Sequence, residues 1–66
     1  MRLSINGEDR DFDGALSIRD LLGQLELASQ QVAVEVNLEL IPRDQHERYE
    51  LGEGDSLEIV TLAGGG

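Results

Sequence analysis

The hydrophobic residues of this chain switch from alternating to helical spacing over one stretch only, and that pattern limits the folds open to the chain. Ile18, Leu21, Leu22 and Leu25 recur at the spacing of three and four residues that places apolar side chains on one face of a helix. On both sides of this stretch, apolar residues alternate with polar ones, as they do in strands with one buried face. The pattern predicts an α+β protein in which one main helix packs on a mixed sheet of four to five strands.

The first part of the chain is predicted to form a hairpin, followed by the helix. Residues 2–6 alternate, and Asn6-Gly7 is a favoured hairpin turn that leads into a second short run ending near Phe12. Ser17 is the expected N-cap of a helix over residues 17–25, because its hydroxyl can accept from a free backbone N–H. Asp20 falls in the first turn, where the helix dipole favours an anion.

The second part of the chain is predicted to form further strands joined by turns. Val32, Val34 and Val36 alternate with Ala33 and Glu35, which predicts a strand with one buried face. The other expected elements are a short strand over residues 38–41, a helical turn over 43–46 after Pro42, a glycine turn over 52–55 and a last strand over 57–62. From the right-handed strand, helix, strand connection we expect the third strand to lie parallel to the first.

The composition excludes several classes of function. Fourteen Asp and Glu residues stand against five Arg and no Lys, which gives a formal net charge of -9 and leaves no basic surface for nucleic acid or for an anionic membrane. The absence of cysteine excludes disulfides and thiolate chemistry. No stretch is apolar for long enough to span a membrane and no signal peptide is evident, so we expect a cytoplasmic location. A chain of 66 residues can build one thin core, so chemistry is expected at its surface or its end.

Single polar residues give little support for catalysis or metal binding. His46 lies in the polar run over residues 44–47 without a second histidine or a cysteine to share a metal, and we expect a solvated surface side chain there. The acids between Glu8 and Asp13 lack the spacing of a calcium-binding loop. Gly52 and Gly54 do not lie between a strand and a helix, as the glycines of a phosphate-binding loop do. The sequence therefore predicts neither a metal site nor catalytic residues.

The strongest functional signal is the run Gly64, Gly65, Gly66 at the C-terminal end of the chain. Without side chains, glycines can lie extended in a narrow channel of a partner enzyme and bring a terminal carboxylate close to a nucleotide or a nucleophile. A carboxylate is a poor electrophile, and adenylation by ATP converts it into an acyl-adenylate that sulfur or nitrogen can attack. The alternative interpretation is an inert, frayed end.

Over its whole length, the chain resembles the ubiquitin-like sulfur carriers with the β-grasp fold, and most of all the ThiS family of thiamine-biosynthesis sulfur carriers. The resemblance rests on Asn6-Gly7, on residues 17–22, 32–37, 41–43 and 51–60, and on the glycines at the end, in this order. It implies a β-grasp domain over residues 1–62 and a flexible reactive tail over 63–66. It also implies a carrier that is not an enzyme and binds no cofactor itself.

The same resemblance implies the partners. An E1-like, ThiF-type adenylyltransferase would use ATP and magnesium to adenylate Gly66, and a sulfur donor such as a cysteine desulfurase would supply the sulfur of a terminal thiocarboxylate. A ThiG-type thiazole synthase would then accept that sulfur. Gly64, Gly65 and Gly66 would enter the active site of each partner enzyme.

Three alternatives remain open at the level of sequence. The small subunit of molybdopterin synthase is longer and usually carries prolines before its tail, where this chain has Val-Thr-Leu-Ala over residues 60–63. A ubiquitin-like modifier is possible, although the lack of lysine excludes lysine-linked chains of the protein on itself. The third alternative is an interaction module with an inert tail.

Two expectations concern docking. Val60 and Leu62 share a face of the last strand with Glu58, so they either form a docking patch for the partner enzymes or pack on a neighbouring strand or under residues 43–49. The net charge of -9 is expected to steer the chain toward a basic rim on a partner.

Overall fold

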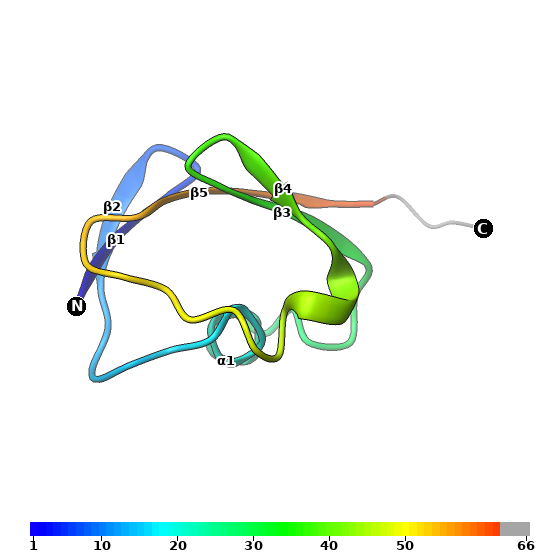
Figure 1. Ribbon diagram of the computed structural model, residues 1–66, viewed down its shortest axis with the longest axis horizontal. Helices are drawn as coiled ribbons and strands as arrows, with labels where there is room; N and C mark the ends of the chain where they lie inside the picture. The colour runs from blue at the N-terminus through cyan, green and yellow to red at the C-terminus, as the bar shows by residue number, and fades with distance from the viewer. Residues whose placement is uncertain (63–66) are drawn as a thin grey trace.

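The computed structural model describes residues 1–62, which form a five-stranded mixed sheet covered on one face by one α-helix (Figure 1). The sheet order is β2-β1-β5-β3-β4, so the last strand of the chain lies at the centre of the sheet. This arrangement confirms the predicted α+β sheet with one main helix. The elements in chain order are β1 (Arg2–Ile5), β2 (Glu8–Asp11), α1 (Ile18–Gln24), β3 (Val32–Val36), β4 (Glu39–Ile41), the 3-10 helix η1 (Arg43–Gln45) and β5 (Ser56–Thr61).

One expected strand direction is wrong. β1 is antiparallel to β2 and parallel to β5, and β3 is antiparallel to β5. β3 therefore runs antiparallel to β1, whereas the sequence analysis placed it parallel to the first strand. The reason is that the chain enters α1 from β2, and a crossover through a helix returns the chain parallel to the strand that it left. The strand that lies parallel to β1 is β5.

Two hairpins turn through pairs of residues in the left-handed region. Asn6 and Gly7 have φ values of 53° and 83° between β1 and β2, which confirms the predicted turn. Asn37 and Leu38 have φ values of 51° and 71° between β3 and β4, so the second turn places a leucine where glycine is usual.

The start of α1 is fixed by the predicted cap and by a distant segment. Ser17 Oγ accepts from the backbone N–H of Asp20 at 3.0 Å, and the Asp20 carboxylate accepts from the backbone N–H of Ser17 at 3.1 Å. These two reciprocal bonds form a capping box. The backbone N–H of Ile18 donates to the Tyr49 carbonyl at 3.0 Å, which ties the helix to the chain that precedes β5.

The core fills the space between α1 and the inner face of the sheet, and it is almost entirely aliphatic. The predicted helix face contributes Ile18, Leu21 and Leu22, whereas Leu25 is only partly buried. The other core residues are Leu3, Ile5, Phe12, Leu16, Val34, Val36, Ile41, Leu51, Leu57 and Ile59. The opposite face of the sheet, called here the outer face, carries no helix or strand among residues 1–62 (Figure 1).

His46 is buried, so the expectation of a solvated surface histidine is wrong. Its side chain is 7% exposed, and its Nε2 lies 3.0 Å from the Ile41 carbonyl oxygen. Its own carbonyl accepts from the backbone N–H of Arg19 at 3.0 Å. The polar neighbours of His46 suggested a surface loop, but η1 turns the chain back over α1 and places this one side chain inward.

Candidate functional site

Two exposed apolar side chains, Val60 and Leu62, lie on the outer face at the C-terminal end of β5. Leu57 and Ile59 are buried in the core, so the alternate residues Glu58, Val60 and Leu62 point to the outer face. The side chains of Val60 and Leu62 are 57% and 51% exposed. The structure therefore does not support their packing under residues 43–49, and it leaves them available to another molecule.

The neighbouring strand β3 fixes the position of these residues. Val60 pairs directly with Ala33 on β3, and the backbone N–H of Leu62 donates to the Gln31 carbonyl at 2.9 Å. β5 is therefore held by β3 up to residue 62, the last one that the structure describes. The sheet therefore fixes the position of the last described residue.

Leu40 adds to the apolar part of the outer face, and the sequence analysis did not identify it. Leu40 pairs with Glu35 on β3, and Glu35 points outward because Val34 and Val36 are buried. Leu40 is 62% exposed. The signal that could have identified it is the register of the short edge strand, in which Ile41 points inward and its neighbour must point outward.

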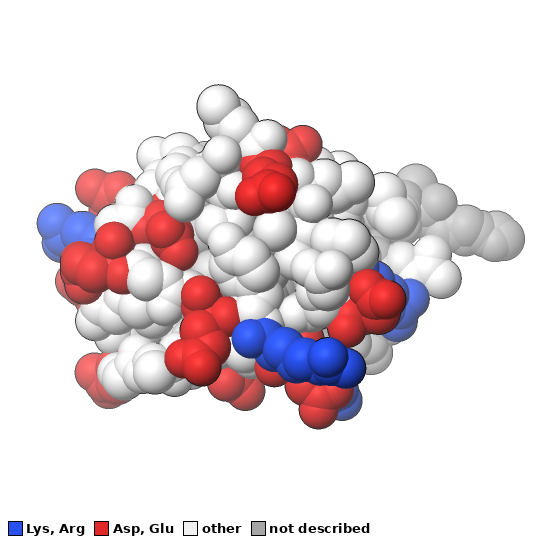
Figure 2. Space-filling view, in the orientation of Figure 1, with Lys and Arg blue, Asp and Glu red and all other residues white. Residues whose placement is uncertain are grey.

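Acidic side chains lie beside this apolar surface. Glu35 and Glu58 are direct cross-strand partners, and like charges in that position repel each other. Figure 2 shows the side of the outer face at the top of the view, where white side chains surround a few red ones. The outer face thus offers apolar contact area next to carboxylates, a combination suited to a protein surface that presents apolar and basic side chains.

Two asparagine side chains hold β5 from opposite sides. On the β1 side, Asn6 Nδ2 donates to the Ile59 carbonyl at 3.1 Å, and Asn6 Oδ1 accepts from the Ile59 N–H at 2.7 Å. On the β3 side, Asn37 Oδ1 accepts from the Ser56 N–H at 3.0 Å, and Asn37 Nδ2 donates to Asp55 at 3.0 Å. The Asn6 amide continues the β1–β5 ladder past the end of β1, so it fixes the strand that leads to the glycines.

The remaining sequence-predicted site residues, Gly64, Gly65 and Gly66, lie outside the described residues. Within residues 1–62, no group of three or more His, Asp or Glu side chains is arranged to hold a metal ion. The same part of the chain has no helix that is long and apolar enough to cross a membrane.

Comparison with known proteins identifies the family. The model of the ThiS family matches residues 3–66 of this chain. The chain belongs to the ThiS family. It is 37% identical to the sulfur carrier protein ThiS of Bacillus subtilis (strain 168) over 65 residues, which cover 97% of this chain and 98% of that protein.

Solved structures confirm the fold of this ThiS-family chain. The crystal structure of the thiamine biosynthesis protein ThiS from Geobacter metallireducens matches it with a TM-score of 0.84 and 33% identity, covering 100% of both chains. The β-grasp fold expected from the sequence is therefore confirmed. The family consists of carriers, so this chain is a sulfur carrier and not an enzyme.

A segment similar to this chain also occurs inside a larger protein. The thiazole synthase of Paramagnetospirillum magneticum is 46% identical over 66 residues, which cover 100% of this chain. The chain spans only 20% of the length of that relative. In that organism, a protein named thiazole synthase therefore contains a segment similar to this whole chain.

Proposed function

We propose that this chain carries sulfur for the thiazole ring of thiamine as a thiocarboxylate on Gly66. The observation that supports this function most directly is the family match, which extends over residues 3–66 and includes the last glycine. The occurrence of a similar segment within a protein named thiazole synthase supports such an enzyme as the sulfur acceptor. The carrier would act in the cytoplasm, where ATP for its activation is available.

The proposed reaction has two steps at the terminal carboxylate. An E1-like adenylyltransferase joins a Gly66 carboxylate oxygen to the α-phosphorus of ATP, with magnesium, and pyrophosphate leaves. A cysteine desulfurase is one possible sulfur donor, and thiols reduce its persulfide to hydrosulfide while they are oxidised to a disulfide. Hydrosulfide then attacks the acyl carbon, AMP leaves and the terminal thiocarboxylate is formed. The carrier supplies only the carboxyl carbon, so ATP, magnesium and the catalytic groups belong to its partners.

We further propose that Val60 and Leu62 form part of the surface that docks on both partner enzymes, while Gly64, Gly65 and Gly66 enter their active sites. Both apolar side chains are about half exposed; Val60 lies on β5, and Leu62 directly follows that strand. Contacts at this position would orient the chain that enters the channel. The acids beside them and the net charge of -9 support a basic rim on each partner.

Intact mass spectrometry tests the reaction. The protein is incubated with the activating enzyme, ATP, magnesium and a sulfur source, alongside a variant that lacks Gly66. The expected product has one oxygen replaced by sulfur, reacts with a thiol-directed alkylating reagent and is absent from the variant. The alkylation is needed because oxidation of Met1 adds almost the same mass. An adenylate that never accepts sulfur would favour a ubiquitin-like modifier, and an unmodified terminus with active enzyme would favour an interaction module.

A choice of acceptor enzymes distinguishes a thiamine-biosynthesis sulfur carrier from the small subunit of molybdopterin synthase. The loaded protein is offered in parallel to thiazole synthase and to the large subunit of molybdopterin synthase. Transfer to thiazole synthase alone is expected. Transfer to the molybdopterin enzyme alone would overturn the assignment to thiamine synthesis while leaving the sulfur-carrier function intact.

Paired aspartate substitutions test the docking surface. Val60→Asp places a charge on the proposed surface, and Leu38→Asp places the same charge at an exposed leucine in the turn beside the start of β5. We expect Val60→Asp to weaken binding to the activating enzyme about tenfold or more, because an apolar contact is replaced by a desolvated charge. The Leu38 variant should bind as the unchanged protein does. Equal binding by both variants would place the docking surface elsewhere.

A further inference from the structure

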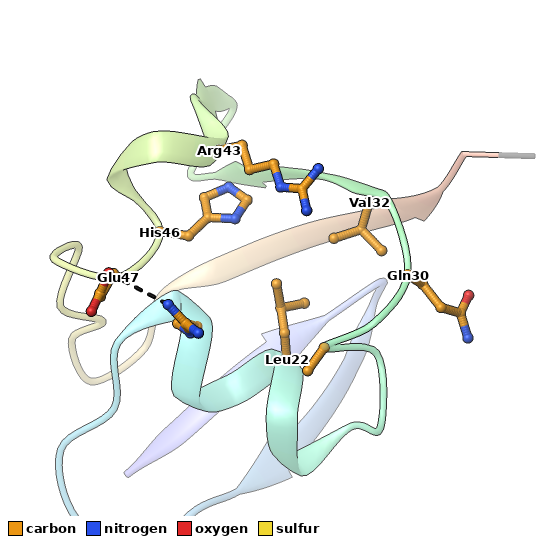
Figure 3. A pocket seen from close by; sticks show the side chains of 8 residues that line it. Leu22, Gln30, Val32, Arg43, His46 and Glu47 are labelled. Carbon is orange, nitrogen blue, oxygen red and sulfur yellow. Dashed lines mark ion pairs between the residues drawn. The ribbon is translucent and has the colours of Figure 1, made fainter. Parts of the chain in front are cut away.

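A pocket of about 160 Å³ lies between α1 and the segment that contains η1, on the helix side of the sheet (Figure 3). It is therefore separate from the outer face of β5. The chief lining side chains are Arg19, Leu22, Val32, Arg43, His46 and Glu47. At about 30 Å³ for each water molecule in the liquid, the pocket has room for a small anion with part of its hydration shell.

The charge of this pocket differs from that of the rest of the chain. Two of the five arginines line it, although the chain as a whole carries a net charge of -9. Arg19 is paired with Glu47 at 3.4 Å, whereas Arg43 forms no ion pair with any residue between 1 and 62. Figure 2 shows most of the blue side chains of this view gathered at its lower right, which is the end of the molecule where Figure 1 places η1. On the Arg43 side, the pocket therefore has a positive charge that is not paired with a carboxylate among residues 1–62.

His46 turns its second ring nitrogen toward the pocket. A carbonyl oxygen can only accept, so the 3.0 Å contact with the Ile41 carbonyl requires the hydrogen on Nε2. Nδ1 has no hydrogen-bond partner among the described residues. In that part of the chain, every buried side-chain nitrogen and oxygen has such a partner. Nδ1 must therefore be accessible, and the pocket that His46 lines is the space that reaches it. In the neutral ring, this atom accepts a hydrogen bond.

Arg43 and His46 lie side by side in Figure 3, above Leu22 and next to Val32. The pocket thus combines a permanent cationic donor with a neighbouring acceptor over an apolar floor. An ordinary carboxylate can accept from Arg43 but has no hydrogen to give to a neutral Nδ1. Hydrogen phosphate can do both, because its P–O⁻ oxygens accept and its P–OH group donates.

We propose that this pocket is a binding site for inorganic hydrogen phosphate, with Arg43 and His46 as its principal ligands. The guanidinium of Arg43 donates to the phosphate oxygens, and the phosphate P–OH donates to His46 Nδ1. The Arg19–Glu47 ion pair closes one side of the pocket without competing for Arg43. This site does not depend on the glycine tail or on the docking surface of β5.

Nuclear magnetic resonance of the full chain, labelled with ¹⁵N, tests the site. Sodium phosphate is added at constant ionic strength, at a pH where the His46 ¹⁵N shifts show a neutral ring. We expect saturable changes at His46 Nδ1 and at the Arg43 side chain. Sulfate and the methyl phosphate dianion, which have no acidic hydroxyl, should bind at least about tenfold more weakly, since each lacks one hydrogen bond to the site.

Matched arginine variants complete the test. Arg43 is exposed, so Arg43→Gln should leave the fold intact and weaken phosphate binding about tenfold or more. Arg10, which lies 5.9 Å from the Phe12 ring centroid, is away from the pocket, and Arg10→Gln should bind phosphate as before. Non-saturating shifts, equal affinity for sulfate, or full binding by Arg43→Gln would each overturn the proposal.

Discussion

The Asn6 side chain holds the C-terminal strand β5 through two hydrogen bonds, and we expect these bonds to contribute measurably to the stability of the domain. Substitution to glycine tests it, because Asn6 has a φ of 53° and glycine accepts that conformation without strain. Asn6→Gly therefore removes the two bonds to the backbone of Ile59 while keeping the turn. Alanine would add the strain of the left-handed region and confuse the result.

The expected loss follows from the two bonds. Each contributes about 0.5–1.5 kcal/mol to folding, and both are partly buried, so the loss in free energy of unfolding should be about 2 kcal/mol. For a domain of this size, about 1 kcal/mol shifts Tm by roughly 4–8 °C, so Tm should fall by about 8–16 °C. The total stability of so small a domain is only about 3–10 kcal/mol, which makes the loss easy to detect.

Thermal and urea denaturation, followed by circular dichroism, measure this loss. Asn37→Gly is the matched control, since Asn37 also has a positive φ and its side chain makes two bonds, but those bonds are exposed. We expect the control to lose about 1 kcal/mol, because exposed groups regain hydrogen bonds with water. In Asn6→Gly, the amide of Ile59 should also exchange with solvent faster than that of Leu57. A loss within about 0.5 kcal/mol of zero, or one no larger than that of the control, would refute this account of Asn6.

Three further predictions concern other parts of the molecule. Replacing His46 with leucine should cost about 1–3 kcal/mol of stability in urea denaturation, because the Ile41 carbonyl loses its donor, and an unchanged midpoint would contradict this. Leu38→Gly should raise the unfolding free energy by about 0.5–1 kcal/mol, since Leu38 is 91% exposed and strained at a φ of 71°; a lower Tm would show that the leucine packs in a way that compensates for the strain. The rate of association with the activating enzyme, measured by stopped flow, should fall as salt is added, and a salt-independent rate would argue against electrostatic steering.

Local patterns were sufficient to predict most of the elements. The alternation of Val32, Val34 and Val36, the Asn6-Gly7 turn and the Ser17 cap each depend on neighbours within a few residues, and each lies where it was expected. The period of the last strand predicted that Val60 and Leu62 share a face with Glu58, but it left open whether that face is exposed, which the structure shows it to be. Their role in docking and the reaction at Gly66 stay predictions.

Features that depend on contacts between distant parts of the chain could not be predicted from local sequence patterns. His46 has polar neighbours in sequence, and only the return of the chain over α1 buries it. Leu40 reaches the outer face through the register of a three-residue strand that a local pattern defines poorly. The direction of β3 depended on which hairpin strand leads into the helix, a question of topology that hydrophobic periodicity does not address.

The central place of β5 has a mechanical consequence for a protein whose C-terminal glycines are proposed to enter partner enzymes. β5 is bonded to β1 on one side and to β3 on the other, and the Asn6 and Asn37 side chains add bonds on both sides. A pull along β5 from its C-terminal end loads these bonds together, in shear, because they lie across the direction of force. Bonds loaded together resist far more force than bonds opened one after another. We therefore expect the described domain to resist a pull on its last strand better than a domain whose last strand lies at the edge of the sheet.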